Sequence, residues 1–427
     1  MPYNYRSKTF ILLLAITIGI STGLVAWLLK LATSSLANVF LTHIHDAKPD
    51  WWLLITPAVG IILTGIFSRY IVRENLEHGT AQLKRNLRKR LYKIRRNRCI
   101  SPLIGCSLTL GFGGSAGAEG PIASAGAAIG SNIGQYVHAD NDTLKTFIGC
   151  GASGGIAAIF AAPIGGLMFS LELLRINLNV NSVLMLFVTS LTSYLTISAL
   201  TGFSTDLSFT AYPDFEIHAI PMVILLGLFC GAYSIYYTSV TSYMDAAYSR
   251  IRNPWIRNLS GGLMLGATLL MFPSMYGTGY PIITDVINEH PESLAKGSPL
   301  MEILSGDKLL IIAAICILLC KCWAVSASNS SGGVAGDFAP TIFAGSMAGF
   351  IFATMSNQCL NMHLHVGAFS YIGMAGVMAG AIQAPLMAIF IILEMTQSYH
   401  FALPLTICAI VSYITTRYGQ HILKKKA

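Results

Sequence analysis

The residue best suited to chemistry in this sequence is Glu119, because it is the only Asp, Glu, Lys or Arg from Cys99 to Ala139. The segment around it is apolar and rich in glycine and alanine. An ionised side chain inside a membrane segment costs several kcal/mol, and such residues are kept mostly for function. Glu119 is therefore the first candidate site residue. The alternative is a buried glutamate that only caps a helix.

Glu119 lies in the sequence Gly117-Ala118-Glu119-Gly120-Pro121, which is followed by a run of small residues. Glycines just before a proline are typical of the first turn of a helix. The free N–H groups and the positive dipole end of such a turn bind anions. A carboxylate there could occupy the place of an anion, and protonation would release it. The pattern indicates an anion site with a proton-sensitive plug.

A second turn of this kind stands in the other half of the chain, and further landmarks recur in the same order. The second turn is Gly336-Asp337-Phe338-Ala339-Pro340, and its proline follows that of the first turn by 219 residues. The other pairs are Phe147-Ile148-Gly149 with Tyr371-Ile372-Gly373 (offset 224), Ala162-Pro163 with Ala384-Pro385 (222) and Glu172 with Glu394 (222). They predict two repeats, about 10–202 and 217–418. Repeats in transporters meet at broken helices near the midplane, so we expect the two turns to converge there.

The composition identifies the surroundings of these segments. Of the 427 residues, 54% are hydrophobic and 11% are charged, whereas soluble proteins carry about 25% charged residues. The mean hydropathy is +0.62. So few charges cannot coat a soluble surface, which excludes a cytosolic enzyme, a disordered chain and a soluble nucleic-acid binder despite the net charge of +8. The expected partner is the lipid bilayer, and no nucleic acid is expected.

Basic residues predict the orientation in the membrane. Nine Lys or Arg and no acid lie between Lys84 and Arg98, and three lysines close the chain. The positive-inside rule places these clusters and the N-terminus in the cytoplasm. The uncharged run from Phe10 to Leu29 is long enough for a first transmembrane helix. We expect one multi-pass domain over residues 1–427, without an appended soluble domain, in the cell inner (plasma) membrane.

Together these motifs resemble those of the CLC family of chloride channels and proton/chloride exchangers. The first turn is similar to their GREGP or GKEGP motif and the second to GxFxP. Glu77-His78-Gly79-Thr80-Ala81 stands where they carry GSGIP, and Ile392-Leu393-Glu394-Met395-Thr396 also fits. The likeness extends from about residue 10 to 418. It implies an all-α integral membrane fold of two inverted repeats with about 17–18 tilted and broken helices, without regulatory tail domains, and a homodimer with one pore per subunit.

The resemblance also assigns roles by position. Glu119 is similar to the gating glutamate. The anion-binding backbone amides fall into two groups: Asp337 and Phe338 for a central site, and Gly117, Ala118 and Gly120 for an outer site. A carboxylate repels a nearby anion, so we expect the side chain of Asp337 to point away or to cap a helix.

Three positions depart from the family pattern. His78 replaces a serine whose hydroxyl contacts the central anion. Its protonation would tighten anion binding, so affinity should rise as internal pH falls, and His78→Ser should remove that dependence. Leu173 stands at the inner glutamate of exchangers and cannot relay protons. Glu172 beside it is either an inner proton path or, like Glu394, a structural residue at a helix end. The late tyrosine of the family has no firm match, and Tyr418 is the closest in type.

Other classes have weaker support. Gly151-Ala152-Ser153-Gly154-Gly155 matches a GxSxG nucleophile pattern, but that pattern belongs to a strand–turn–helix context. The pairs His43-Ile44-His45 and His363-Leu364-His365 lie in polar connections, where two histidines rarely suffice for a metal. We expect no cofactor, no metal and no enzymatic activity.

The sequence therefore predicts transmembrane chloride transport gated by Glu119, with protons and monovalent anions as the transported partners. Proton/chloride exchange is favoured. A passive voltage- or pH-gated chloride channel is the alternative, followed by a fluoride-selective exporter and an intramembrane hydrolase.

Overall fold

The computed structural model describes residues 8–41, 51–74, 76, 79–202, 215–299 and 307–426. Within these residues the chain forms sixteen α-helices with short 3₁₀ and π segments and no strand. The helices of the first half are α1 (Lys8–Leu41), α2 (Trp52–Ile66), α3 (Gly79–Arg88), α4 (Ser101–Gly111), α5 (Glu119–Tyr136), α6 (Asn141–Phe160), α7 (Pro163–Met168) and α8 (Val180–Thr201). Those of the second half are α9 (Ile220–Ser249), α10 (Pro254–Met271), α11 (Tyr280–Ile287), α12 (Asp307–Asn329), α13 (Phe338–Leu360), α14 (Val366–Ile382), α15 (Pro385–Thr396) and α16 (Ala402–Lys426).

The helices have the lengths and apolar surfaces of a membrane protein. In the described part of the chain, eight are long and apolar enough to cross a bilayer. Others, such as α7 and α15, are short because Ala162-Pro163 and Ala384-Pro385 interrupt the helical segments, and a proline has no N–H for the preceding turn. Large apolar side chains are exposed along the outer helices, as lipid contact allows. The expectation of an all-α membrane protein with broken helices is confirmed.

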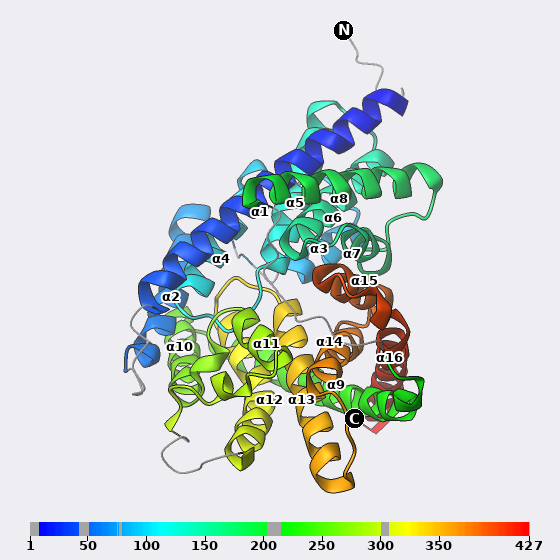
Figure 1. The fold of residues 1–427 in the computed structure, drawn as a ribbon. Helices are drawn as coiled ribbons and strands as arrows, with labels where there is room; N and C mark the ends of the chain where they lie inside the picture. Colours follow the sequence, from blue (N-terminus) through cyan, green and yellow to red (C-terminus); the bar gives the residue numbers. More distant parts are fainter. Residues whose placement is uncertain are drawn as a thin grey trace.

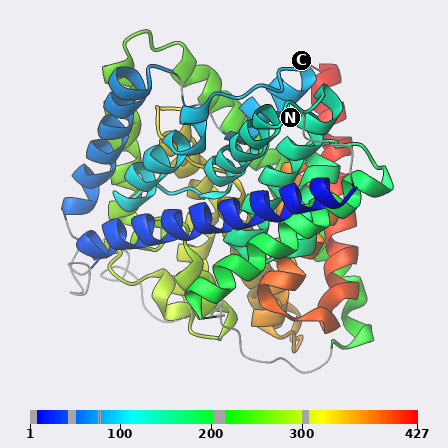
Figure 2. The same ribbon diagram turned by 90° about the horizontal axis from the view of Figure 1, so that it is seen from above.

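The two halves repeat the same helix contacts. Helix α1 packs on α8 as α9 packs on α16, and α5 packs on α6 as α13 packs on α14. Figure 1 shows most of the first half, coloured blue to green, above the yellow to red helices of the second half. Viewed from above, α1 runs across the whole molecule beside the green helices (Figure 2).

Glycines hold the inner helix pair of each repeat close together. A Cβ atom added to Gly126 would lie 2.1 Å from the carbonyl oxygen of Gly151 in the first repeat, and one added to Gly345 would lie 2.4 Å from that of Gly373 in the second. Residues without side chains allow helix backbones this close approach. Gly126 and Gly345 are 219 residues apart, and Gly151 and Gly373 are 222 residues apart. The repeated sequence motifs have the same two offsets. The repeat is therefore present in the packing as well as in the sequence.

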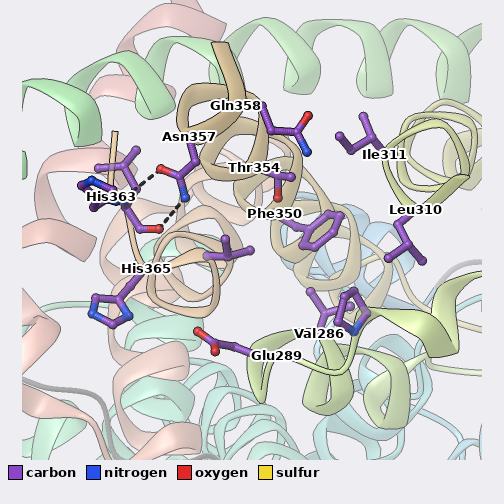
Figure 3. Close-up of a pocket in the computed structure, with 13 residues that line it drawn as sticks. Val286, Glu289, Leu310, Ile311, Phe350, Thr354, Asn357, Gln358, His363 and His365 are labelled. Carbon is purple, nitrogen blue, oxygen red and sulfur yellow. Dashed lines mark hydrogen bonds between the residues drawn. The ribbon is translucent and has the colours of Figure 1, made fainter. Parts of the chain in front are cut away.

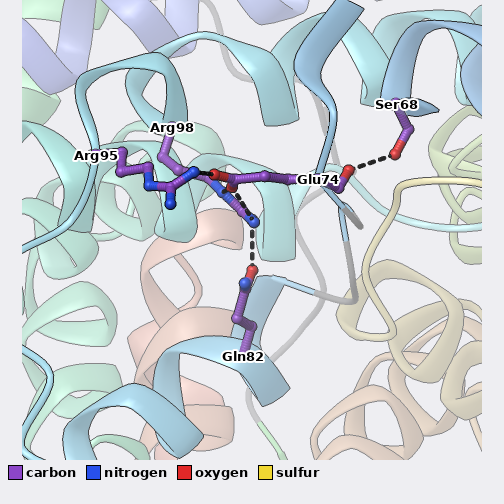
Figure 4. A network of polar contacts seen from close by, with 5 residues as sticks. All are labelled: Ser68, Glu74, Gln82, Arg95 and Arg98. Carbon is purple, nitrogen blue, oxygen red and sulfur yellow. Dashed lines mark hydrogen bonds and ion pairs between the residues drawn. The ribbon is translucent and has the colours of Figure 1, made fainter. Parts of the chain in front are cut away.

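An ion-pair network fixes the basic segment against the helices. Arg98 Nε donates to Glu74 Oε2 at 2.7 Å, Arg98 also donates to Gln82 on α3, and Arg95 pairs with the same glutamate (Figure 4). The hydroxyl of Ser68 donates to the carbonyl oxygen of Glu74 at 2.7 Å. These contacts join the end of the π segment η1 (Phe67–Val72), α3 and the 3₁₀ segment η2 (Arg96–Cys99) on one side of the molecule.

Candidate functional site

The two glycine-proline turns meet in the centre of the structure. Gly117 N–H donates to the carbonyl oxygen of Gly336 at 2.8 Å, and Gly336 N–H donates to that of Gly117 at 2.6 Å. Helix α5 begins two residues after the first glycine, and α13 begins two residues after the second. The positive ends of two helices from opposite repeats therefore point to one place, which is the arrangement expected for an anion site.

The carboxylate of Glu119 occupies this meeting point. Its side chain is only 1% exposed. Oε1 accepts hydrogen bonds from Ala339 N–H of α13 at 3.1 Å and from the Tyr280 hydroxyl at 3.4 Å. Oε2 folds back over Gly117, where an added Cβ would lie 1.9 Å from it. The first glycine of the turn is thus needed to make room for the carboxylate, which lies between the N-terminal ends of α5 and α13.

In the second turn, Phe338 is buried, whereas the side chain of Asp337 is exposed. Phe338 begins α13 and is buried, with its ring edge-to-face against Phe169 at 5.9 Å. Asp337 is exposed, and its Oδ1 accepts a hydrogen bond from Asn329 Nδ2 at 2.8 Å. Its side chain makes no capping bond to α13. The side chain of Asp337 therefore points away from the end of α13 and does not cap this helix. Of the two orientations expected from the sequence, this is the first.

Glu172 and Glu394 form a reciprocal pair of helix caps between the repeats. Glu394 accepts hydrogen bonds from Ile164 and Gly165 N–H at the start of α7, at 3.0 and 2.7 Å. Glu172 accepts one from Met387 N–H at the start of α15, at 2.8 Å. Carboxylates at helix N-termini are stabilising. These contacts favour the structural interpretation of Glu172.

The remaining predicted residues do not all reach the site. Ala118 and Gly120 are buried in the first turn beside Glu119. Tyr418 does not lie there: its side chain is 69% exposed on α16, because the helix continues past it and turns that face outward. His78 lies outside the described residues, as do His43 and His45.

A cavity of about 490 Å³ leads toward the second turn from the side of the basic segment. Asn329, which holds Asp337, lies in its wall. Gly332 and Gly333, a few residues before the turn, line it too. Its charged lining residues are Arg69, Arg85, Asp245 and Arg257. Three arginines against one aspartate give this entrance an excess of positive charge, which concentrates anions.

A second cavity, of about 570 Å³, lies at the far end of α13 and includes none of the predicted anion-binding residues. Figure 3 shows Glu289, His363 and His365 around it, with Asn357 bridging to the backbone of residue 364. Both histidines are exposed. In the described part of the chain, no group of three or more His, Cys, Asp or Glu side chains could hold a metal.

Ser153 is placed in the interior of α6 and is fully buried. Its hydroxyl donates to the carbonyl oxygen of Cys150 at 2.9 Å. The strand–turn–helix geometry of a nucleophile elbow is not formed at this serine. Its neighbours Gly151 and Gly155 pack against the backbone of α5, at Gly126 and Ile122.

Lys321 of α12 is a buried cation that the sequence reasoning did not single out. Its side chain is 0% exposed. Nζ donates to Ser115 Oγ at 2.8 Å, two residues before the first turn, and lies 4.5 Å from the centre of the Phe343 ring. The amino group of Lys321 therefore lies near the first turn, and no described ion pair involves it.

Tyr237 of α9 was also missed. Its hydroxyl is buried and has no hydrogen-bond partner among the described residues. Asp337 and Glu119 are among its electrostatic neighbours. By contrast, the hydroxyl of Tyr233, one turn earlier, donates to the carbonyl oxygen of Leu318 at 2.8 Å. One of the two tyrosine hydroxyls is thus bonded within the fold, and the other is buried without a partner among the described residues.

The sequence is similar to those of known chloride transport proteins. It is 26% identical over 419 residues to the H(+)/Cl(-) exchange transporter ClcA of Vibrio vulnificus, covering 95% of this chain and 86% of that protein. It is 27% identical over 428 residues to the chloride channel protein CLC-e of Arabidopsis thaliana, covering 57% of the latter.

Two solved structures have the same fold. A slow cyanobacterial Cl-/H+ antiporter superposes with a TM-score of 0.79 at 21% identity, over 96% of this chain and 94% of that one. A CLC-type fluoride/proton antiporter superposes with a TM-score of 0.78 at 22% identity, over 97% of each chain. The profile of the family described as voltage gated chloride channel matches residues 59–417. The chain therefore belongs to the voltage-gated chloride channel family, the CLC family that its motifs resemble.

Proposed function

We propose that this protein exchanges chloride for protons across a membrane. The observation that carries the proposal is the position of the Glu119 carboxylate, which accepts a hydrogen bond from the first turn of α13 where two helix N-termini meet. A negative group already occupies the place that suits an anion. The names of the relatives, an exchange transporter and a chloride channel, agree with an anion as the substrate.

The proposed mechanism is a competition between the carboxylate and chloride. Ionised Glu119 blocks the pathway because its carboxylate fills the space between the two helix ends and accepts a hydrogen bond from Ala339 N–H. When it takes up a proton it loses its charge and its advantage over chloride at the helix ends. Chloride then binds at backbone amides of the two turns: Ala118 and Gly120 on one side, Asp337 and Phe338 on the other. The Gly117 N–H, which the sequence also suggested, is engaged by the carbonyl oxygen of Gly336. Each cycle moves the proton on Glu119 against the anion that replaces it.

The positive-inside rule gives the proposed orientation. The segment from Lys84 to Arg98 faces the cytoplasm, so the cavity lined by Arg69, Arg85 and Arg257 is the inner entrance. We place the protein in the inner (plasma) membrane with both termini inside. It is proposed to be a single transmembrane domain of two repeats that pairs into a homodimer with one pore per subunit.

Flux from proteoliposomes tests this function. The purified protein is reconstituted with a chloride gradient, and external chloride and pH are recorded together. Uphill proton movement driven by chloride is the expected result. Chloride release without proton movement would contradict exchange and establish the runner-up, a passive channel. Replacing chloride by fluoride in the same assay tests the fluoride-selective alternative, which one structural neighbour makes worth measuring.

Tyr237 is proposed to donate its hydroxyl to the bound anion, in place of the late tyrosine that Tyr418 does not supply. A hydrogen bond to a charged group contributes about 1.5–3 kcal/mol, so Tyr237→Phe should weaken chloride binding about tenfold or more. Isothermal titration of chloride into the purified protein measures this.

Tyr233→Phe is the matched control, because it removes the same hydroxyl from a residue whose bond is to Leu318. It should lower thermal stability and leave chloride affinity within about twofold. Equal chloride affinities of the two variants would show that Tyr237 does not bind the anion.

A further inference from the structure

A carboxylate exposed beside an anion site requires an explanation. Asp337 supplies one of the proposed anion-binding amides, yet its side chain adds a negative charge that repels the ion. It neither caps α13 nor lies buried. Asn329 holds its Oδ1 at 2.8 Å and belongs to the wall of the arginine-lined cavity. The carboxyl group is thus hydrogen-bonded to a residue of the cavity wall.

Asp337 is also next to the gate. Oε1 of Glu119 is bound by Ala339 N–H, two residues after Asp337. A Cβ added to Gly336, the residue before it, would lie 2.9 Å from the other oxygen, Oε2. The carboxylate of Glu119 therefore lies against the second turn both before and after Asp337 in the sequence. The carboxyl groups of Glu119 and Asp337 interact electrostatically.

The position of the inner glutamate of CLC exchangers, and the carboxylates of Glu172 and Glu394, do not offer a free proton acceptor. Leu173 is apolar and buried. Glu172 accepts the N–H group of Met387 as a helix cap, and Glu394 does the same for Gly165. If Glu172 or Glu394 moved to carry a proton, the N–H groups that it caps would lose their hydrogen bonds. Unsatisfied N–H groups are costly in a membrane.

We propose that Asp337 is the inner proton-loading group of this protein. This inference rests on the proposed exchange of chloride for protons, and the proton transfer has two parts. The ionised carboxylate of Asp337 takes a proton from water in the inner cavity and passes it to ionised Glu119. Asp337 is left as a carboxylate again, and neutral Glu119 yields its place to chloride. The reverse sequence returns a proton to the inside.

The charges of the cavity and of the first turn allow this role. Arg69, Arg85 and Arg257 line the cavity whose wall includes Asn329, the hydrogen-bond partner of Asp337, and positive charge there favours an ionised carboxyl group, the form that accepts the proton. Glu119 from α5 and Asp245 from α9 oppose them. Mixed charges of this kind let one carboxyl group both gain and release a proton.

The test compares Asp337→Asn with Asp245→Asn in the proteoliposome assay. Asp245 is the other carboxylate in the wall of the cavity, where it accepts a hydrogen bond from Ser330. Asp337→Asn should lower the ratio of proton flux to chloride flux at least tenfold, because the group that loads the proton is lost. Asp245→Asn should change the rates of both ions together and preserve their ratio. Asp337→Glu, which keeps a titratable group, should restore coupling in part.

The outcomes separate this inference from the function on which it rests. A wild-type protein that moves no protons would overturn both. A coupled wild type with a coupled Asp337→Asn variant would overturn only the loading role. Loss of coupling in Glu172→Gln with Asp337→Asn unaffected would also overturn it. Size-exclusion profiles confirm that each variant is folded before flux is measured.

Discussion

Replacing Glu119 by glutamine is expected to abolish proton movement while chloride continues to cross the membrane. Glutamine matches the size of the side chain but carries neither a proton nor a negative charge, so it cannot compete with chloride for the ends of α5 and α13. Proton flux should fall below detection, and chloride flux should be equal to or greater than that of the wild type. Simultaneous records of chloride and pH from proteoliposomes measure both.

The pH dependence follows from the same group. Protonation neutralises the plug, so wild-type chloride flux should rise as pH falls and diminish as pH rises. In Glu119→Gln the flux should be nearly independent of pH over the same range. A variant that retained the wild-type pH profile would show that another group controls the pathway.

Glu172→Gln is the control for removing a membrane carboxylate. Its hydrogen bond to Met387 N–H caps α15, and losing a helix cap costs about 0.5–2 kcal/mol. We expect a lower melting temperature and an unchanged proton-to-chloride ratio. Coupling lost in this variant as well would revive the interpretation of Glu172 as a proton path.

Local sequence was sufficient to predict that the two glycine-proline turns meet. Glycine-proline turns are defined by neighbours along the chain, and the repeat offsets required both turns to be equivalent. Glu119 could therefore be singled out, and the meeting of Gly117 with Gly336 could be expected. The confirmed fold class rests on the same features, because apolar length and broken helices are visible in sequence.

The contacts between the repeats could not be predicted in this way. Glu172 and Glu394 were recognised as a pair, but not that each caps a helix of the other repeat, since that depends on how the halves pack. Tyr237 is one of 18 tyrosines, and only its unsatisfied hydroxyl distinguishes it. Lys321 did have a signal, because it is a lysine inside an apolar run, and charged residues in membrane segments are rare.

Replacing Lys321 by methionine is expected to weaken chloride binding about tenfold. The motif that the first turn resembles carries Arg or Lys where this chain has Ala118, so the turn lacks its own positive charge. The ammonium group of Lys321, bonded to Ser115, supplies that charge from α12. Unit charges in an effective dielectric of about 20 interact by about 1–2 kcal/mol over roughly 8–15 Å, which corresponds to about a tenfold change in affinity.

A second variant moves the charge back to the turn. Lys321→Met combined with Ala118→Lys should recover most of the lost affinity, measured by titration of chloride, because the cation again lies beside the two helix ends. Lys145→Met controls for net charge: this half-buried lysine bonds to Asn177 and belongs to neither turn, so affinity should be unchanged. Methionine should preserve or raise the melting temperature, since a buried charge without an ionic partner is costly to desolvate. Loss of folded protein in Lys321→Met, with normal affinity in the remainder, would instead make Lys321 a structural residue that anchors Ser115.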